Sequence, residues 1–148
     1  MKTLSPKKSG VKTYAMLVDG KLVQAEGGRL RDITDPASGE LLARVPEAGR
    51  ADAKKAIAAA RRAFDSGPWR KTTAQDRGRL LFKVAEGIRA RAKSLAELEV
   101  RNMGKPLAEA EFDVADAAAC FEFYGGLATK IHGETMSVPA NSLSFVVR

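Results

Sequence analysis

Short apolar runs separated by turn residues fill the first third of the chain. In the segment MLVDGKLVQA, Asp19-Gly20 stands between two such runs. This pattern predicts a β-hairpin over residues 16–25, because both central residues of a type I′ turn need positive φ. A second strand pair is predicted near 29–34 and 40–46, joined by the turn sequence DPASG.

Apolar residues recur at helical spacing from about residue 50 onward. Gly-Pro stops, S/T-x-x-D/E caps and single glycines set the ends of the predicted helices. Four helices are predicted: from about Arg50 to Gly67, from Thr73, from Ser94 to Gly104, and from Pro106 to about His132. Trp69 follows the first stop, and we expect it to be a packing anchor.

The last predicted helix and the last predicted strand both suggest an incomplete body. At about 1.5 Å per residue the helix would span about 40 Å, too long for a small domain to cover alone. The final strand, over residues 142–148, stops in the middle of its pattern. We therefore expect a truncated chain of α+β character, whose apolar surface a larger α/β protein would cover.

The net charge of +7 lies largely in the first residues. Residues 1–13 hold four lysines and no acid, which leaves 7 − 4 = +3 for the remainder. We interpret residues 1–13 as a disordered basic leader and expect no nucleic-acid partner. No apolar run suits a membrane span or a signal peptide, so a cytoplasmic protein is expected.

Few residues offer catalytic chemistry. One cysteine and one histidine exclude an internal disulfide and a Cys/His zinc cluster. We expect Cys120 to be a packed, inert thiol, and His132 to be a helix C-terminal residue favoured by the macrodipole. Helix starts account for the nearby carboxylates of Glu97, Glu99, Glu109 and Glu111. No glycine-rich phosphate loop is present.

Asp113 and Asp116 are more informative, because a spacing of three places both carboxylates on one face of the long predicted helix. They fit either a solvated helix face or a mouth that concentrates positively charged small molecules. The residues alone leave both readings open.

Five short motifs follow one another in a familiar order: Asp-Gly, Pro-x-x-Gly-Glu, Pro-Trp, Gly-Lys-Pro and Tyr-Gly-Gly. From about residue 15 to residue 148 the sequence resembles the opening of the aldehyde dehydrogenase superfamily. The resemblance implies β-hairpins and a four-helix outer layer, with the Rossmann-like core absent. It assigns residues 14–133 to part of the cofactor-binding domain and 134–148 to the first oligomerisation strands.

The stretch FDVADAAACFEFYGG is similar to the matching stretch of betaine-aldehyde and amino-aldehyde dehydrogenases. In those enzymes acidic residues border the entrance of the aldehyde tunnel, and their positions match Asp113 and Asp116. Phe112 falls where the family often places an apolar tunnel residue. A broad-specificity aldehyde dehydrogenase is the alternative.

The resemblance also implies a structural monovalent cation. Family members bind it with backbone carbonyls that match Ile33 and Thr34 and with an Asp that matches Asn102. Because Asn102 offers a neutral amide oxygen, we expect the cation to be held less tightly.

The parent enzyme implied is a homo-oligomer that oxidises an aldehyde to a carboxylate with NAD or NADP. No catalytic or cofactor-binding residue can be assigned to this sequence, and we expect the chain alone to be inactive. The alternative is a non-catalytic product that associates with other subunits, or a small helical interaction domain.

Overall fold

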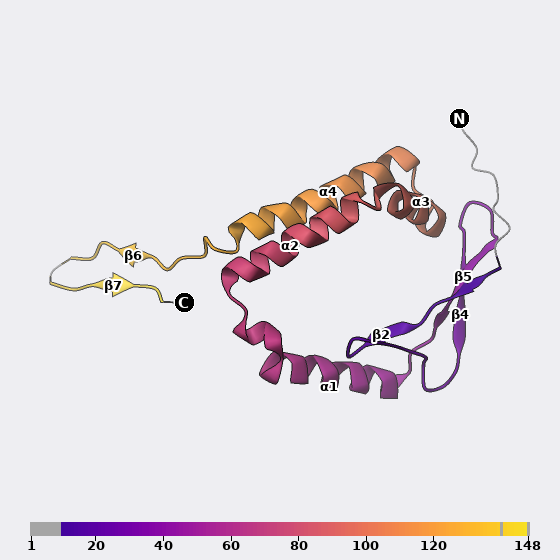
Figure 1. Ribbon diagram of the computed structural model, residues 1–148, viewed down its shortest axis with the longest axis horizontal. Coiled ribbons are helices and arrows are strands. Elements are labelled where there is room, and N and C mark those ends of the chain that lie inside the picture. Colours follow the sequence, from indigo (N-terminus) through magenta and orange to yellow (C-terminus); the bar gives the residue numbers. More distant parts are fainter. Residues whose placement is uncertain (1–9, 140, 148) are drawn as a thin grey trace. The chain divides into compact units, whose positions relative to one another are not determined.

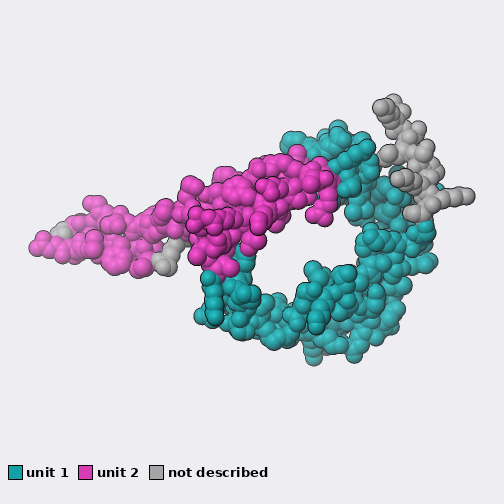
Figure 2. Space-filling view, viewed as in Figure 1, with its two compact units in different colours: residues 1–71, 93–112 teal, residues 72–92, 113–148 magenta. Residues whose placement is uncertain are grey.

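The computed structural model describes residues 10–139 and 141–147, which form small sheets and four α-helices (Figure 1). The chain divides into two compact units, coloured separately in Figure 2: residues 1–71 with 93–112, and residues 72–92 with 113–148. The mixed α+β character predicted from the sequence is confirmed.

The first unit holds a three-stranded sheet in the order β1-β5-β4. β4 (Leu30–Thr34) and β5 (Leu41–Pro46) are antiparallel, as predicted, and Gly39 in their connecting turn has φ 73°. The carboxylate of Asp35 accepts a hydrogen bond from the Ala37 N–H at 2.8 Å, which fixes the start of that turn.

β1 (Lys12–Thr13) pairs in parallel with β5, with Lys12 opposite Ala43. The predicted disordered leader was therefore wrong for these two residues, whose order comes from a partner about thirty positions away along the chain. A two-residue strand is too short to show apolar alternation in the sequence. Residues 1–9 of the predicted leader lie outside the described residues.

The predicted hairpin is confirmed as β2 (Met16–Val18) and β3 (Lys21–Val23). Asp19 has φ 54° and Gly20 has φ 72°, the two positive values that a type I′ turn requires.

α1 (Arg50–Ser66) ends before Gly67, as predicted. The carboxylate of Asp52, 7% exposed, accepts hydrogen bonds from the N–H of Gly49 at 2.9 Å and of Glu26 at 3.0 Å. It thus caps the helix and ties the segment after β3 to it. These two backbone hydrogen bonds lower the pKa of Asp52, because they stabilise the charged carboxylate.

A short 3₁₀-helix, η1 (Pro68–Lys71), follows α1. Trp69 lies in it and is 50% exposed, so the predicted packing anchor was wrong. A four-residue surface turn offers too little cover to bury an indole.

α2 (Ala74–Arg89) belongs to the second unit and begins at the predicted cap, where the Thr73 hydroxyl accepts a hydrogen bond from the Asp76 N–H at 3.1 Å. Its Gly78 lies against Gly125: a Cβ added to Gly78 would be 2.7 Å from the Gly125 carbonyl oxygen. Arg89 also donates two hydrogen bonds to the Glu122 carboxylate. The backbones of α2 and α4 therefore approach closely, at a point where a side chain would keep them apart.

α3 (Ala92–Met103) begins two residues before the predicted Ser94 cap. Ala92 and Lys93 are good helix formers, so the helix extends through them and Ser94 is a residue of its first turn. Its predicted end is confirmed, since Gly104 has φ 80°.

α4 (Leu107–Leu127) ends five residues before the predicted end at His132. The adjacent Gly125 and Gly126 weaken the last turn, because glycine is a poor helix former. The helix is therefore about 32 Å long rather than about 40 Å. His132 lies beyond it, so its predicted role at the helix C-terminus was wrong.

The last two strands, β6 (Thr135–Met136) and β7 (Ser144–Phe145), pair as a short antiparallel ladder. The strand predicted over 142–148 is reduced to two residues, and Arg148 lies outside the described residues. With a partner strand of only two residues, the ladder cannot extend further along the apolar run.

Among the described residues, the buried apolar side chains are all small: Ala25, Ala43, Ala59, Ala85, Ala96, Ala110 and Ala118. Cys120 is exposed, which corrects the predicted packed thiol, because its side chain leaves a different side of α4 from that of the buried Ala118. The described helices include none that is long and apolar enough to cross a membrane.

Candidate functional site

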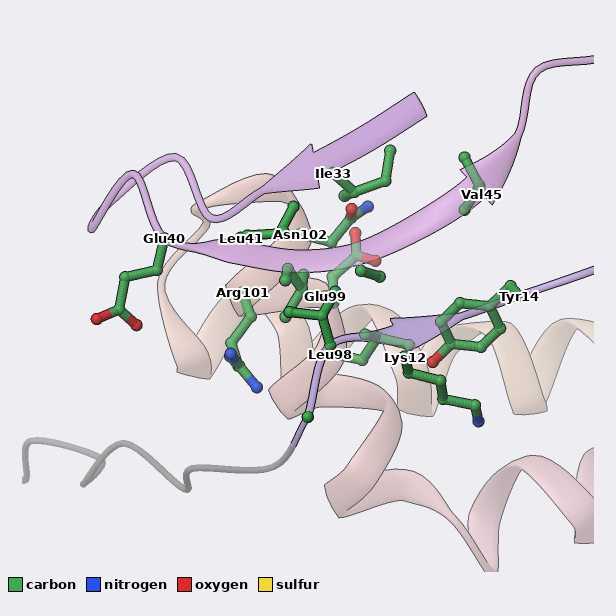
Figure 3. Close-up of a pocket in the computed structure, with 14 residues that line it drawn as sticks. Lys12, Tyr14, Ile33, Glu40, Leu41, Val45, Leu98, Glu99, Arg101 and Asn102 are labelled. Atoms are coloured by element: carbon green, nitrogen blue, oxygen red, sulfur yellow. The ribbon is translucent and has the colours of Figure 1, made fainter. Parts of the chain in front are cut away.

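A cavity of about 920 Å³ lies in the first unit, between the three-stranded sheet and α3 (Figure 3). Ile33, Ala43 and Val45 line it from the sheet, and Leu98 lines it from α3. Charged side chains of Lys12, Glu40, Glu99 and Arg101 also line it. The cavity thus has an apolar floor with both signs of charge around it.

Strand register explains which side chains face the cavity. Ile33 is directly opposite Ala43 in the ladder, and Arg31 is opposite Val45, so these positions share one face. Asp32 and Arg44 project from the other face, where they form an ion pair of 2.9 Å. Alternation along β4 and β5 therefore sends the apolar side chains toward α3 and the charged pair away from it.

Backbone direction along β4 determines where its carbonyls point. The Arg29 carbonyl accepts a hydrogen bond from the Glu47 N–H, and the Asp35 N–H donates to the Glu40 carbonyl, each at 2.9 Å. Since these groups alternate along a strand, odd-numbered residues of β4 face β5, and Thr34 directs its carbonyl to the open edge. β4 is the edge strand of the sheet, so this oxygen has no ladder partner there.

Ile33 lies where the ladder is irregular. It is opposite Ala43, whereas Thr34 is opposite Leu41, so Leu42 is the extra residue of a β-bulge. A bulge leaves the hydrogen-bonding groups of its extra residue out of the regular ladder. The predicted cation ligands Ile33 and Thr34 thus lie where a regular sheet is interrupted.

Asn102 reaches the same cavity from the last turn of α3. The next turn of the chain fixes the position of that helix end. Gly104 packs against the Asp35-Pro36 turn so closely that an added Cβ would be 2.9 Å from Cγ of Pro36. Close contact at Gly104 therefore holds Asn102 beside the β4–β5 bulge.

Glu99 precedes Asn102 by one turn of α3 and lines the same cavity. Figure 3 labels both Glu99 and Asn102 among the side chains that line the cavity. Lys105 Nζ lies 3.4 Å from Oε1 of Glu99. Glu99 was predicted to be one of the carboxylates at a helix start, which was wrong, because α3 begins seven residues earlier and Glu99 lines the cavity instead.

The donor set around the bulge can be compared with the needs of different ions. Backbone and amide oxygens with one carboxylate suit a hard cation of low charge. Among the residues described, no group of three or more His, Cys, Asp or Glu side chains could hold a metal ion. The residues present therefore fit the monovalent cation that the resemblance implies better than they fit zinc or a transition metal.

The other predicted site residues lie together on α4. Phe112 is 67% exposed, and Asp113 and Asp116 are exposed as well. The helix places the two carboxylates three residues apart, hence on one side. Both carboxylates thus lie at the surface, as a solvated helix face and a cation-attracting mouth would each require.

Sequence reasoning missed Asp52, the buried carboxylate that joins α1 to the segment after β3. A signal for it was present: Asp52 stands three residues after Gly49, in the N3 position of a capping box. One backbone N–H donates to each of its two oxygens, from Glu26 and from Gly49, and this use in the backbone assigns it to folding rather than to chemistry.

Comparison with known proteins shows which family the sequence matches. Residues 22–148 match the model of the aldehyde dehydrogenase family. The chain is 45% identical over 137 residues to a betaine aldehyde dehydrogenase of Bacillus subtilis, covering 92% of this chain and 28% of that protein. It is 37% identical to an aldehyde dehydrogenase of Aspergillus niger, covering 88% of this chain and 26% of that protein.

Solved structures are similar as well. The NAD-dependent aldehyde dehydrogenase of Sinorhizobium meliloti superposes with a TM-score of 0.81 at 38% identity, over 93% of this chain and 29% of that one. A betaine aldehyde dehydrogenase of Staphylococcus aureus, solved in complex with NAD+, superposes with a TM-score of 0.80 at 37% identity, over 86% and 26%. The chain therefore spans between a quarter and three tenths of the length of these relatives.

Proposed function

The chain belongs to the aldehyde dehydrogenase family, and from this we infer that it forms the N-terminal portion of an NAD(P)-dependent enzyme that oxidises an aldehyde to a carboxylate. The observation that carries the proposal is the family match over residues 22–148, which includes β4, β5 and all four α-helices. The NAD+ complex of the Staphylococcus aureus relative supports the nicotinamide cofactor.

Within that enzyme, residues 14–133 form part of the cofactor-binding domain and residues 134–148 begin the strands through which a homo-oligomer assembles. This segment contributes to the structure of the enzyme and supplies no catalytic residue. A thiolate nucleophile needs an activating base or cationic neighbour. Cys120 has the apolar Ala117, Phe121 and Tyr124 near it along α4, so it has no assigned part in the reaction, and the segment alone is inactive.

We propose that the substrate is a cationic aldehyde, such as betaine aldehyde or an amino-aldehyde. The exposed carboxylates of Asp113 and Asp116 support this, because negative charge beside an entrance raises the local concentration of a cation. Phe112 beside them offers an apolar surface to the substrate's methyl or methylene groups. The 45% identity to a betaine aldehyde dehydrogenase agrees with this choice.

A chimera tests both proposals. Residues 10–148 replace the matched segment of the Bacillus subtilis betaine aldehyde dehydrogenase, and steady-state oxidation of betaine aldehyde and of a neutral aldehyde is followed through NADH. An active chimera is expected. Loss of all activity in a chimera that folds and binds NAD+ would contradict the proposed role of the segment.

The substrate class is tested in the same chimera with D113N/D116N. Two surface charges contribute about 1 kcal/mol, so KM for betaine aldehyde is expected to rise about fivefold, with kcat and the neutral aldehyde unchanged. E109Q/E111Q removes equal charge from the first turns of α4 and serves as the matched control. Equal effects of the two double variants, or equal effects on both aldehydes, would contradict a specific role for the acidic pair.

We also propose that carbonyls of Ile33 and Thr34 and the amide oxygen of Asn102 hold a monovalent cation. The open-edge carbonyl of Thr34 and the position of Asn102 support it. Alternation directs the Ile33 carbonyl toward β5, at the bulge where the ladder is interrupted, and the proposal requires this carbonyl to be free there. Because residue 102 offers an amide oxygen, the cation is bound more weakly than it would be by a carboxylate at the same position.

A second candidate function is association of the chain with other subunits without catalysis. Large apolar side chains on α4 and near β7 favour it: Phe112, Phe123, Tyr124, Phe145 and Val147 are each more than half exposed. Exposed apolar surface of this kind drives association. Light scattering after size exclusion tests this, and a stable, cooperatively folding monomer would contradict it.

A further inference from the structure

The cavity between the sheet and α3 carries a carboxylate that the proposed cation site does not yet use. Glu99 precedes Asn102 by three residues, so both side chains leave the same face of α3. Both line the cavity that Ile33 lines from the sheet. An oxygen donor with a full negative charge is thus beside the neutral amide.

The Glu99 carboxylate retains capacity for a ligand. It forms an ion pair with Lys105 Nζ, at 3.4 Å. A close charge-assisted hydrogen bond is about 2.7–2.9 Å long, so this pair is held loosely. A carboxylate has about four lone-pair positions, so this one loose ammonium partner among the described residues leaves room for a cation to share it.

The proposed cation site lacks a negative charge, because the side chain of Asn102 is a neutral amide. Neutral carbonyl and amide oxygens can coordinate a monovalent cation, but they leave its charge uncompensated in a cavity with an apolar floor. Glu99 is 39% exposed on its side chain, so it is neither fully solvated nor fully buried. Its charge therefore acts at close range with less screening than a fully solvated carboxylate has.

We propose that Glu99 supplies the negative charge of the cation site, in place of the carboxylate that Asn102 lacks. The inference rests on the proposed cation site at Ile33, Thr34 and Asn102. The ion is K+ or Na+, since one carboxylate balances one positive charge. Glu99 is a charge-supplying ligand in this site and has no part in the chemistry of the aldehyde.

Sodium-23 NMR line broadening tests the proposal on the full chain, with K+ as the competitor and circular dichroism to confirm that each variant is folded. E99Q keeps the size and hydrogen-bonding capacity of Glu99 and removes its charge, so Na+ affinity is expected to fall about tenfold. E97Q removes a charge from the same helix at a position that does not line the cavity, and its affinity is expected to stay within twofold of the parent chain.

Two further variants separate the possible failures. N102D is expected to raise the affinity, and N102D/E99Q is expected to return it to that of the parent chain, because one carboxylate replaces the other. If neither the folded parent chain nor folded N102D binds Na+ or K+, the cation site itself is overturned. If the parent binds and E99Q binds equally well, the site stands and the role of Glu99 is overturned.

A purely structural role for Glu99 gives a different signature. Thermal unfolding of E99Q and of the parent chain is compared in N-methylglucamine buffer and in K+. A cation ligand makes the two melting temperatures differ only when K+ is present, since a bound ion stabilises the folded state by mass action. An equal difference in both buffers would contradict the proposal.

Discussion

The contact between Gly78 and Gly125 makes a quantitative test of how α2 and α4 pack. A Cβ added at Gly78 would lie 2.7 Å from the Gly125 carbonyl oxygen and 3.4 Å from Cβ of Ala128. The first contact involves backbone, so no side chain can rotate away, and the helices would have to separate by about half an ångström. Overpacking of this kind costs about 1–3 kcal/mol.

Gly87, also in α2, provides the matched control for G78A. A Cβ at Gly87 would meet only Nη2 of Arg91, at 3.6 Å, which is ordinary contact with a flexible side chain. Replacing glycine by alanine inside a helix stabilises it by about 0.8–1.0 kcal/mol, and this gain is common to both variants. Their difference in unfolding free energy therefore isolates the close contact, and it should be about 1–3 kcal/mol.

Urea and thermal unfolding followed by circular dichroism measure this difference. G87A is expected to melt above the parent chain, and G78A below G87A by roughly 2–4 °C for each kcal/mol. A slope of the urea transition that is unchanged between variants would confirm that the same cooperative unit unfolds. If G78A and G87A are stabilised equally, α2 and α4 do not meet at Gly78, and the predicted close contact is wrong.

Two other substitutions test the turns and caps of the first unit. G104A is expected to destabilise the chain by about 1–2 kcal/mol, because Gly104 has φ 80° and lies against Pro36. G126A is the control and should not destabilise the chain, because nothing lies within 4 Å of the added Cβ. Melting temperatures that shift equally in the two variants would contradict this prediction. D52N is expected to lower the melting temperature at neutral pH, because Asp52 then no longer accepts two backbone hydrogen bonds as a charged group. Folding lowers the pKa of Asp52, so the contribution of its carboxylate to stability is fully present above the ordinary pKa of 3.8. This contribution is lost as the pH falls through the lower pKa of the folded state. The melting temperatures of D52N and the parent chain should therefore converge only in acid.

Local signals carried most of the successful predictions. Asp19-Gly20 needs no distant partner to form a type I′ turn, and Thr73 caps α2 through a residue three positions away. β1 was missed because its order depends on β5. The end of α4 was misplaced because the apolar pattern continues past the glycine pair that terminates the helix.

The residues of the candidate site also differ in how far the sequence could predict them. Ile33, Thr34 and Asn102 came from resemblance to a family, and spacing alone would not have joined β4 to α3. The structure brings Ile33 and Asn102 to one cavity, while Thr34 is placed by its backbone. Glu99 was assigned to capping because the start of α3 was placed too late, so one misplaced boundary hid a carboxylate that faces the cavity.

The alanine-rich interior described above has a thermodynamic consequence. Unfolding raises the heat capacity chiefly by bringing apolar surface into water, and an average chain gains about 12–15 cal/mol/K per residue. Here Leu17, Leu22 and Val147 are already more than 70% exposed in the folded chain, so their hydration changes little on unfolding. The segment should therefore have a flatter curve of stability against temperature than its length implies, until another surface covers these side chains and restores the curvature.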